Sequence, residues 1–284
     1  FWKFVQFKFY EQWESFRAYV NGLGIKIMGD MPIYVAMDSA DTWANPELFQ
    51  LYDDGDPIAV AGCPPDYFSE TGQLWGNPIY NWEKMKQDNF SWWIKRIKRH
   101  LELYDIIRID HFRGFAGYYA IPYGDATARY GAWHSAPGKE LFKTVNETFN
   151  DAKIIAEDLG FITPDVRELL EFTGYPGMKI LQFAFDSREE SDYLPHNYVA
   201  NSIVYTGTHD NNTIKGWYKE SSFTNKVDKI TKGSTGNITL YAKWEAITYT
   251  ITYVLNGGTL PSGAPTTYNT ETETFVISTP TKTG

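Results

Sequence analysis

Residues 104–115 read YDIIRIDHFRGF, a short apolar run that contains and precedes charged residues. The apolar residues Ile106, Ile107 and Ile109 are typical of a short buried strand. Arg108 and Asp110 lie two residues apart, so on a strand their side chains point to the same face. Burying charged groups is costly unless they are paired. The stretch therefore predicts a strand whose last residues open onto a polar site.

The same pattern recurs up to about residue 218, where helical stretches are followed by short apolar runs that end in polar residues. Helices alternating with buried strands indicate parallel β/α units. Five strands are predicted, at 25–30 (IKIMGD), 106–110 (IIRID), 153–158 (KIIAED), 179–185 (KILQFAF) and 202–210 (SIVYTGTHD). Helices are predicted at 9–21, at 88–103 with Asp88 as its cap, at 139–150 and from Thr163–Pro164 onward.

An acidic residue stands at the end of each predicted strand. These residues are Asp30, Asp110, Glu157, Asp186 and Asp210. In a parallel β/α barrel the carboxyl ends of the strands form the face that carries the active site. Two long segments, 31–87 and 111–138, are rich in Pro, Gly, Trp and Tyr, and we expect them to be structured loop insertions on that same face.

Composition excludes several classes of protein. The 284 residues carry a net charge of −9, and no basic stripe is present, so a nucleic-acid partner is not expected. No apolar run approaches the ~18 residues of a membrane span, so we expect no membrane insertion. The five histidines lack zinc-ligand spacing, and we infer no metal and no cofactor. The single cysteine, Cys63, is expected to pack rather than react.

The two ends of the sequence differ in character. The chain begins at Phe1 inside an amphipathic helical pattern, so we expect the natural start to lie upstream. From about residue 226, Thr, Gly and Asn become frequent, and residues 247–254, ITYTITYV, alternate strictly. Such alternation is typical of a half-buried strand, and NGG at 256–258 predicts a turn. The C-terminal part therefore reads as a separate, β-rich module.

The sequence environments of Asp110 and Glu157 suit two different catalytic roles, a nucleophile and a general acid. Arg108 would hold Asp110 ionised with a depressed pKa, as a nucleophile requires. Partial burial and neighbouring acids would raise the pKa of Glu157, as a general acid requires. Retaining glycosidases use such a pair of carboxylates. His209 and Asp210 could hold sugar hydroxyls and stabilise an oxocarbenium-like charge. Taken singly, each acid also fits a structural role at a strand end.

Five motifs in order resemble one family, the 4-α-glucanotransferases, also called amylomaltases or disproportionating enzymes, of glycoside hydrolase family 77. The motifs are GDMPIYV (29–35), PPDYFSETGQLWGNPIYNW (64–82), RIDHFRGF (108–115), IIAEDLG (154–160) and TGTHDNNT (206–213). The resemblance covers about residues 1–218. It implies retaining transfer of α-1,4-glucan segments between maltooligosaccharides through a covalent glucosyl-aspartate.

The resemblance also implies roles for individual residues. Asp110 matches the nucleophile, Glu157 the general acid/base and Asp210 the transition-state stabiliser. Arg108 matches the arginine that positions the nucleophile, and the sugar contacts are implied for His111 and His209. Asp30 matches an acid at an earlier strand end. A mobile loop over the acceptor sites is implied by the remaining matches, which are Asp66, Tyr67, Phe68 and Trp75.

The implied fold is α/β, a partial (β/α)8 barrel containing about strands three to seven. The family's segment with strands one and two, and its eighth strand, have no counterpart in this chain. Residues 216–244 resemble the end of a Listeria–Bacteroides (internalin B-type) surface repeat, and 249–284 resemble the start of the next. Such repeats are small β-grasp-like modules. We therefore expect a barrel domain at 1–218 and a β-repeat region at 219–284.

Three functions remain open at this point. The chain is an active 4-α-glucanotransferase, a catalytically dead barrel fragment carried on a bacterial cell-surface adhesin-type repeat protein, or a remnant that binds glucan without turnover. Localisation divides in the same way. The enzyme family implies the cytoplasm, whereas the repeats imply the cell surface or the extracellular space.

Overall fold

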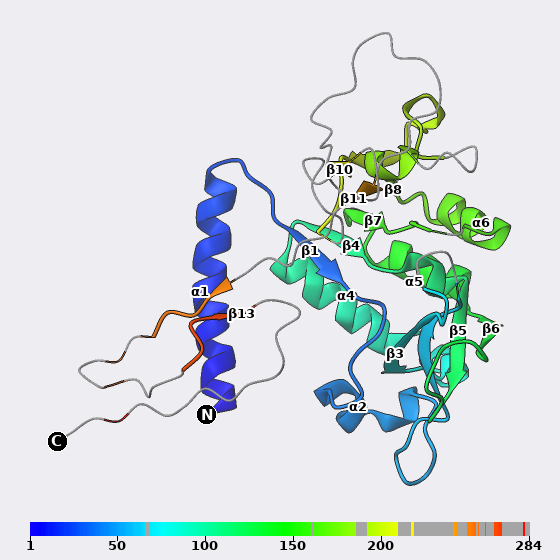
Figure 1. The fold of residues 1–284 in the computed structure, drawn as a ribbon, viewed down its shortest axis with the longest axis horizontal. Helices are drawn as coiled ribbons and strands as arrows, with labels where there is room; N and C mark the ends of the chain where they lie inside the picture. Colours follow the sequence, from blue (N-terminus) through cyan, green and yellow to red (C-terminus); the bar gives the residue numbers. More distant parts are fainter. Residues whose placement is uncertain are drawn as a thin grey trace. The chain divides into compact units, whose positions relative to one another are not determined.

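A computed structural model of the chain describes residues 1–65, 69–160, 162–185 and 192–209, together with short stretches at 217–218, 241–242, 249–253, 255, 259, 264–268 and 281 (Figure 1). The chain divides into two compact units. The first comprises Phe1–Ile180 with Asp192–Tyr205, and the second comprises Leu181–Ser191 with Thr206–Gly284. Mixed helices and strands give the first unit the predicted α/β character.

The five predicted parallel strands are all present. In the first unit, β1 (Met28–Met31), β4 (Ile106–Ile109) and β7 (Ile154–Ala156) form one parallel sheet in the order β1-β4-β7 (Figure 1). The strands β8 (Gly177–Ile180) and β9 (Ser202–Tyr205) form a second parallel pair. The predictions for 179–185 and 202–210 were wrong in their extent, since β8 ends at Ile180 and β9 ends at Tyr205. The ladder with β9 ends at Ile180, and Leu181–Phe185 then forms a 3-10 helix, η3.

Four helices accompany these strands, and their ends follow local chemistry. The helix α4 (Ser91–Leu103) contacts β1 and β4 and buries Trp93 and Ile97, four residues apart on one face. The predicted cap Asp88 accepts a hydrogen bond from the Ser91 N–H at 3.1 Å, although the helix begins three residues later than predicted. The others are α1 (Trp2–Gly22), α5 (Gly138–Thr148) and α6 (Pro164–Thr173).

The two long insertions pair with each other to form a sheet. The strands β2 (Ala59–Cys63) and β3 (Gln73–Pro78) come from the first insertion, and β5 (Gly117–Pro122) and β6 (Ala132–Ser135) from the second. They form an antiparallel sheet in the order β3-β2-β5-β6. The sequence predicted structured loops here and did not predict this sheet. Short helices complete these segments, namely α2 (Ala40–Ala44), η1 (Pro46–Leu48), α3 (Trp82–Lys86) and η2 (Phe112–Phe115).

Aromatic side chains fill the core beneath the parallel sheet. Trp93, Phe112, Phe115 and Phe142 are at most 1% exposed. The Tyr80 ring is also buried, and its hydroxyl donates a hydrogen bond to the Ile33 carbonyl at 2.6 Å. Buried aromatic side chains each remove a large apolar area from water and dominate core energetics. This packing anchors the segments that follow β1 and β4.

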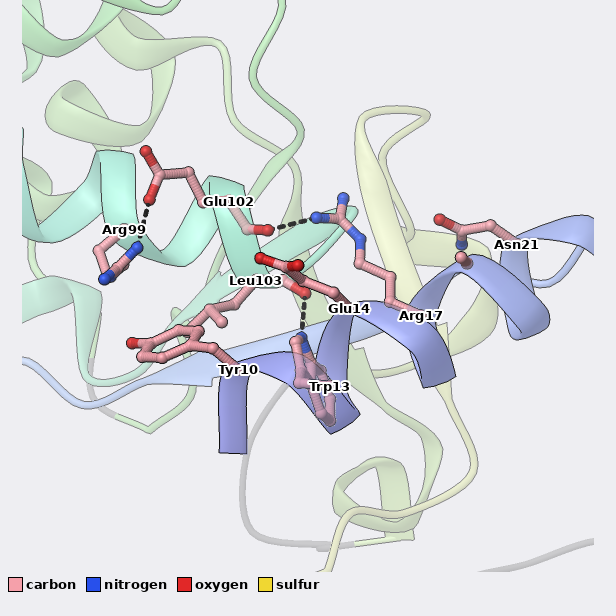
Figure 2. Close-up of a pocket in the computed structure, with 9 residues that line it drawn as sticks. Tyr10, Trp13, Glu14, Arg17, Asn21, Arg99, Glu102 and Leu103 are labelled. Atoms are coloured by element: carbon pink, nitrogen blue, oxygen red, sulfur yellow. Dashed lines mark hydrogen bonds and ion pairs between the residues drawn. The ribbon is translucent and has the colours of Figure 1, made fainter. Parts of the chain in front are cut away.

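The helix α1 is attached along one side only. The Trp13 indole donates to the Leu103 carbonyl at 2.9 Å, and the Arg17 guanidinium donates to the Glu102 carbonyl (Figure 2). Arg17 also pairs with the Asp105 carboxylate at 3.0 Å. No residue of α1 is buried, and Phe4 and Tyr19 are 64% and 68% exposed. Part of the apolar face of α1 is therefore uncovered in the described part of the chain.

The described C-terminal stretches contain short antiparallel pairs. The strand β10 (Trp217–Tyr218) pairs with β11 (Tyr241–Ala242), and β12 (Tyr249–Thr250) pairs with β13 (Thr267–Tyr268). The predicted strand at 247–254 is thus described only in part, and the predicted turn at 256–258 lies outside the described residues. Among the residues described, none of the helices combines the length and the apolar character that crossing a bilayer would require.

Candidate active site

Arg108 stands between two carboxylates at the carboxyl ends of β1 and β4. Asp30 and Arg108 are partners in the parallel register of the two strands. Arg108 Nη1 lies 2.6 and 2.7 Å from the two oxygens of Asp30, and Nη2 lies 2.8 Å from Asp110 Oδ1. The Arg108 side chain is 11% exposed, whereas those of Asp30 and Asp110 are 47% and 41% exposed. The arginine is thus inside the sheet end, and both carboxylates face the solvent-accessible side.

The charge of Arg108 is secured by its partners. Burial opposes the charged guanidinium, but the hydrogen bonds with Asp30 and the charges of Asp110, Asp30 and Glu157 outweigh it, so the pKa of Arg108 is raised. A permanently charged and doubly paired arginine fixes the direction of both carboxylates. The ion pair explains why Arg108 and Asp110 lie on the same face of the strand.

Glu157 follows directly after β7 and is buried, with 9% of its surface exposed. Its Oε2 accepts the backbone N–H of His111 at 2.8 Å, and its Oε1 accepts that of Leu159 at 2.6 Å. Burial raises the pKa of Glu157 to about 7, and the charge of Asp110 adds to the rise, against the two backbone N–H groups and Arg108. Near neutral pH this carboxyl can therefore both give and take a proton.

His111 links the two carboxylates through its backbone. Its φ of 52° is in the left-handed region, an uncommon conformation for a non-glycine residue that costs about 1 kcal/mol. This turn aims the His111 N–H at Glu157, one residue after Asp110. Burial, with the charge of Arg113, lowers the pKa of the imidazole to about 4, so the ring is neutral at pH 7. Trp75 meets that ring edge-on, with centroids 4.8 Å apart.

The structure brings together six of the residues singled out in the sequence. They are Asp30, Trp75, Arg108, Asp110, His111 and Glu157. His209 is exposed and belongs to the second compact unit. Four further candidates, Asp66, Tyr67, Phe68 and Asp210, lie outside the described residues, as does Asp186.

Sequence reasoning considered Asp158 only as an acidic neighbour of Glu157, and it gave no role to Met178. Asp158 is 6% exposed and accepts the Met178 N–H at 2.6 Å, and the Met178 sulfur lies 3.4 Å from Arg108 Nε. The pair of adjacent acids after a buried strand was the only available signal for Asp158. A separate cavity of about 360 Å³ lies between α1 and α4 (Figure 2). None of the candidate residues lines it.

Known proteins similar to this chain are 4-alpha-glucanotransferases. The Clostridium butyricum enzyme is 51% identical over 230 residues, which is 81% of this chain and 47% of that protein. The Thermus thermophilus enzyme is 53% identical over 224 residues, which is 78% of this chain and 45% of that protein. A solved Streptococcus agalactiae amylomaltase, in complex with acarbose, superposes with a TM-score of 0.72 at 52% identity, covering 74% of this chain and 43% of that one.

The two matched regions together cover all 284 residues and overlap at 249–256. The model of the Listeria-Bacteroides repeat domain matches residues 249–284, which confirms the resemblance predicted for that part of the tail, whereas its match does not include residues 216–244. The model of the 4-alpha-glucanotransferase family matches residues 1–256. The chain spans about half the length of the curated relatives it matches. By the extent of the family match and its identity to these enzymes, the chain belongs to the 4-alpha-glucanotransferase family.

Proposed function

We propose that this chain carries the catalytic centre of a retaining 4-α-glucanotransferase that acts on maltooligosaccharides. One observation carries the proposal. A solvent-facing carboxylate, Asp110, is fixed by Arg108 beside a buried carboxyl, Glu157, whose pKa is raised to about 7. Two carboxyl groups in opposite electrostatic settings match the division of labour in retaining glycoside chemistry.

In the first step, the Asp110 carboxylate attacks the anomeric carbon of the donor glucan. The bond from that carbon to the glycosidic oxygen breaks, and Glu157 gives its proton to the departing oxygen. A β-linked glucosyl-aspartate remains. Arg108 pairs with Asp110 at 2.8 Å and keeps that carboxylate oriented for the attack.

In the second step, Glu157 acts as a base. It takes the proton from the 4-hydroxyl of an acceptor sugar, whose oxygen attacks the anomeric carbon and displaces Asp110. The new α-1,4 bond completes the transfer. The raised pKa of Glu157 suits a group that gives a proton in the first step and takes one in the second.

The remaining predicted contacts assist these steps. Trp75 and the neutral His111 ring provide an apolar edge and a hydrogen-bonding nitrogen for sugar. We assign transition-state stabilisation to Asp210, with His209 on donor hydroxyls, and we assign acceptor covering to the loop of Asp66, Tyr67 and Phe68. Covering the intermediate favours a sugar hydroxyl over water as acceptor.

The finer fold and domain assignments belong to the same proposal. We assign β1, β4, β7, β8 and β9 to strands three to seven of a (β/α)8 barrel, with the barrel domain at 1–218 and a β-grasp-like repeat region at 219–284. The parallel pairing within β1-β4-β7 and within β8-β9 supports the barrel assignment. The repeat-domain match at 249–284 supports the second region.

Incubation of the chain with maltotriose tests the activity. We expect glucose together with maltooligosaccharides longer than maltotriose, and neither product with Asp110→Asn. The control variant Asp151→Asn changes an exposed carboxylate before β7 and is expected to match the wild type. Products in the Asp110→Asn variant would contradict the nucleophile assignment.

A second function is supported by a different observation. The repeat-domain match, with the separate β1-β4-β7 and β8-β9 ladders, fits a catalytically inactive barrel fragment carried by a cell-surface adhesin-type protein. Acarbose, which the similar Streptococcus agalactiae amylomaltase holds, separates the two functions. If the chain is active, acarbose is expected to raise its melting temperature, and the chain is expected to transfer glucan. An inactive fragment shows neither effect at concentrations where the Clostridium butyricum enzyme shows both.

A further inference from the structure

The segment after β7 carries two adjacent buried carboxyl groups that face different neighbours. Glu157 accepts hydrogen bonds from His111 and Leu159, next to the end of β4. Asp158 accepts the Met178 N–H of β8 at 2.6 Å. By these hydrogen bonds, Glu157 is tied to the residue that follows Asp110 and Asp158 is tied to β8.

Asp158 connects two strands at the place where their ladder is incomplete. In the described chain, β7 pairs with β4 and β8 pairs with β9, but β7 and β8 do not belong to one ladder. The backbone bond from Ala156 N–H to the Pro176 carbonyl, at 2.9 Å, is followed by the side-chain bond from Asp158 to Met178. The carboxylate thus takes the place of a backbone acceptor, and it ties the segment carrying Glu157 to β8.

Gly177 is the residue that makes room for this connection. A Cβ added at Gly177 would lie 2.5 Å from Asp158 Oδ2 and 2.7 Å from Oδ1. Gly177 is not among the glycines with positive φ, so no turn requires a glycine here. The close approach of the Asp158 carboxylate is the feature that a larger residue would prevent.

The same connection reaches the arginine of the site. Met178, held by Asp158 through its N–H, places its sulfur 3.4 Å from Arg108 Nε. Arg108 in turn pairs with Asp30 and Asp110. Arg108 keeps its bonds with Asp30 and Asp110 without this contact, so loss of Asp158 is expected to affect Glu157 more than the nucleophile.

We propose that Asp158 is a positioning residue for Glu157, tying the end of β7 to the start of β8 through the Met178 N–H in a space that Gly177 leaves open. The proposal rests on the role proposed for Glu157. Asp158 does not touch the reacting atoms, and it acts by holding the Glu157 backbone in place. A misplacement of about 1 Å can cost about 100-fold in rate.

Several charged groups near Glu157 and Asp158 influence the protonation of these two carboxyl groups. Asp110 and Arg108 act on Glu157 from β4. Lys179, 3.9 Å from Asp158 Oδ2, and Arg167 of α6 act on Asp158. The Tyr193 hydroxyl accepts the Gly160 N–H at 3.2 Å, and its pKa responds to both acids. Asp158→Ala removes one of these groups, whereas Gly177→Ala retains all of them.

The first test compares two donors. Maltotriose needs protonation of its leaving group by Glu157, whereas α-maltotriosyl fluoride does not. For Asp158→Ala and Gly177→Ala we expect glucan transfer from maltotriose to fall about 100-fold, while first-turnover fluoride release falls less than about 3-fold. Asp158→Asn keeps an acceptor oxygen for Met178, retains the shape of the side chain and is expected to lose less. Equal losses on both donors would overturn the proposal.

The second test needs no turnover. The Glu157 carboxyl is followed by 13C NMR in a glutamate-labelled full chain, with its signal assigned by its loss in Glu157→Gln. In Asp158→Ala and Gly177→Ala we expect its midpoint to fall by about one pH unit, because the displaced carboxyl becomes hydrated. Asp151→Asn is the control with no shift. An unchanged midpoint in folded variants would overturn the positioning role. Absence of transfer and fluoride release in the wild type would instead overturn the proposed function.

Discussion

Replacing Glu157 by glutamine changes how the stability of the first unit depends on pH. Burial raises the pKa of Glu157 from 4.5 to about 7. Between these values the folded chain keeps a proton on Glu157 that the unfolded chain has released. Stability therefore falls as pH rises from 4.5 to 7, since the native state binds more protons. At about 1.4 kcal/mol per pH unit, the loss amounts to about 3 kcal/mol.

The Glu157→Gln variant has no proton to release and escapes this loss. It retains one carbonyl oxygen for the two N–H groups of His111 and Leu159, so it carries a constant penalty of about 1–3 kcal/mol. Relative to the wild type, the variant is expected to be destabilised at pH 4.5. Between pH 4.5 and pH 7.5, its free energy of unfolding relative to that of the wild type is expected to rise by about 3 kcal/mol.

Urea unfolding at several pH values measures this difference, followed by the fluorescence of the buried Trp82 and Trp93. The matched control is Glu147→Gln, which changes an exposed glutamate at the end of α5. The control difference is expected to be independent of pH. A Glu157→Gln difference that is equally flat between pH 4.5 and 7.5 would refute the account of a buried, protonated carboxyl.

Three further predictions concern other parts of the chain. Asp110→Ala is expected to lose transfer entirely. When azide is added with α-maltotriosyl fluoride, the variant is expected to form a glycosyl azide, because azide fills the space of the missing carboxylate. Chromatography detects this product, and its absence in an otherwise folded variant counts against Asp110 as the nucleophile. Asp105→Asn weakens hydrogen bonds from Arg17, Asn21 and the Ile27 N–H and is expected to cost about 2 kcal/mol at pH 7. These bonds hold the pKa of Asp105 low, so the loss of stability is present above pH 4 and disappears as acid protonates Asp105 in the wild type. Urea unfolding at pH 7 measures the loss, and a value below about 0.5 kcal/mol would contradict a stabilising role for these bonds. Tyr67→Ala is expected to increase the ratio of hydrolysis to transfer, measured as reducing sugar formed per glucan transferred, and an unchanged ratio argues against a covering loop.

The parallel strands were predictable because their signal is local. Short apolar runs ending in acids located β1, β4, β7 and β9, and Thr163 with Pro164 located the start of α6. The antiparallel sheet was not predictable in this way. Its strands β2 and β5 are separated by more than fifty residues, and the partner of a strand cannot be read from its own composition.

The site was predictable to the extent that its residues lie on one strand. The spacing of Arg108 and Asp110 indicated a shared face, and the structure pairs them at 2.8 Å. The bond between Arg108 and Asp30 depends on the register of two strands, which the sequence alone does not specify. The left-handed turn at His111 and the approach of Asp158 to Gly177 likewise depend on tertiary contacts.

Trapping the covalent intermediate would show which carboxylate is the nucleophile. Glu157→Gln incubated with α-maltotriosyl fluoride can be glycosylated, because fluoride leaves without an acid, whereas the slow second step lets the intermediate accumulate. Mass spectrometry of the digested chain is expected to find maltotriosyl on the peptide containing Asp110. Labelling of a different carboxylate, or no labelling under conditions that label the matching variant of the Clostridium butyricum enzyme, would contradict the assignment.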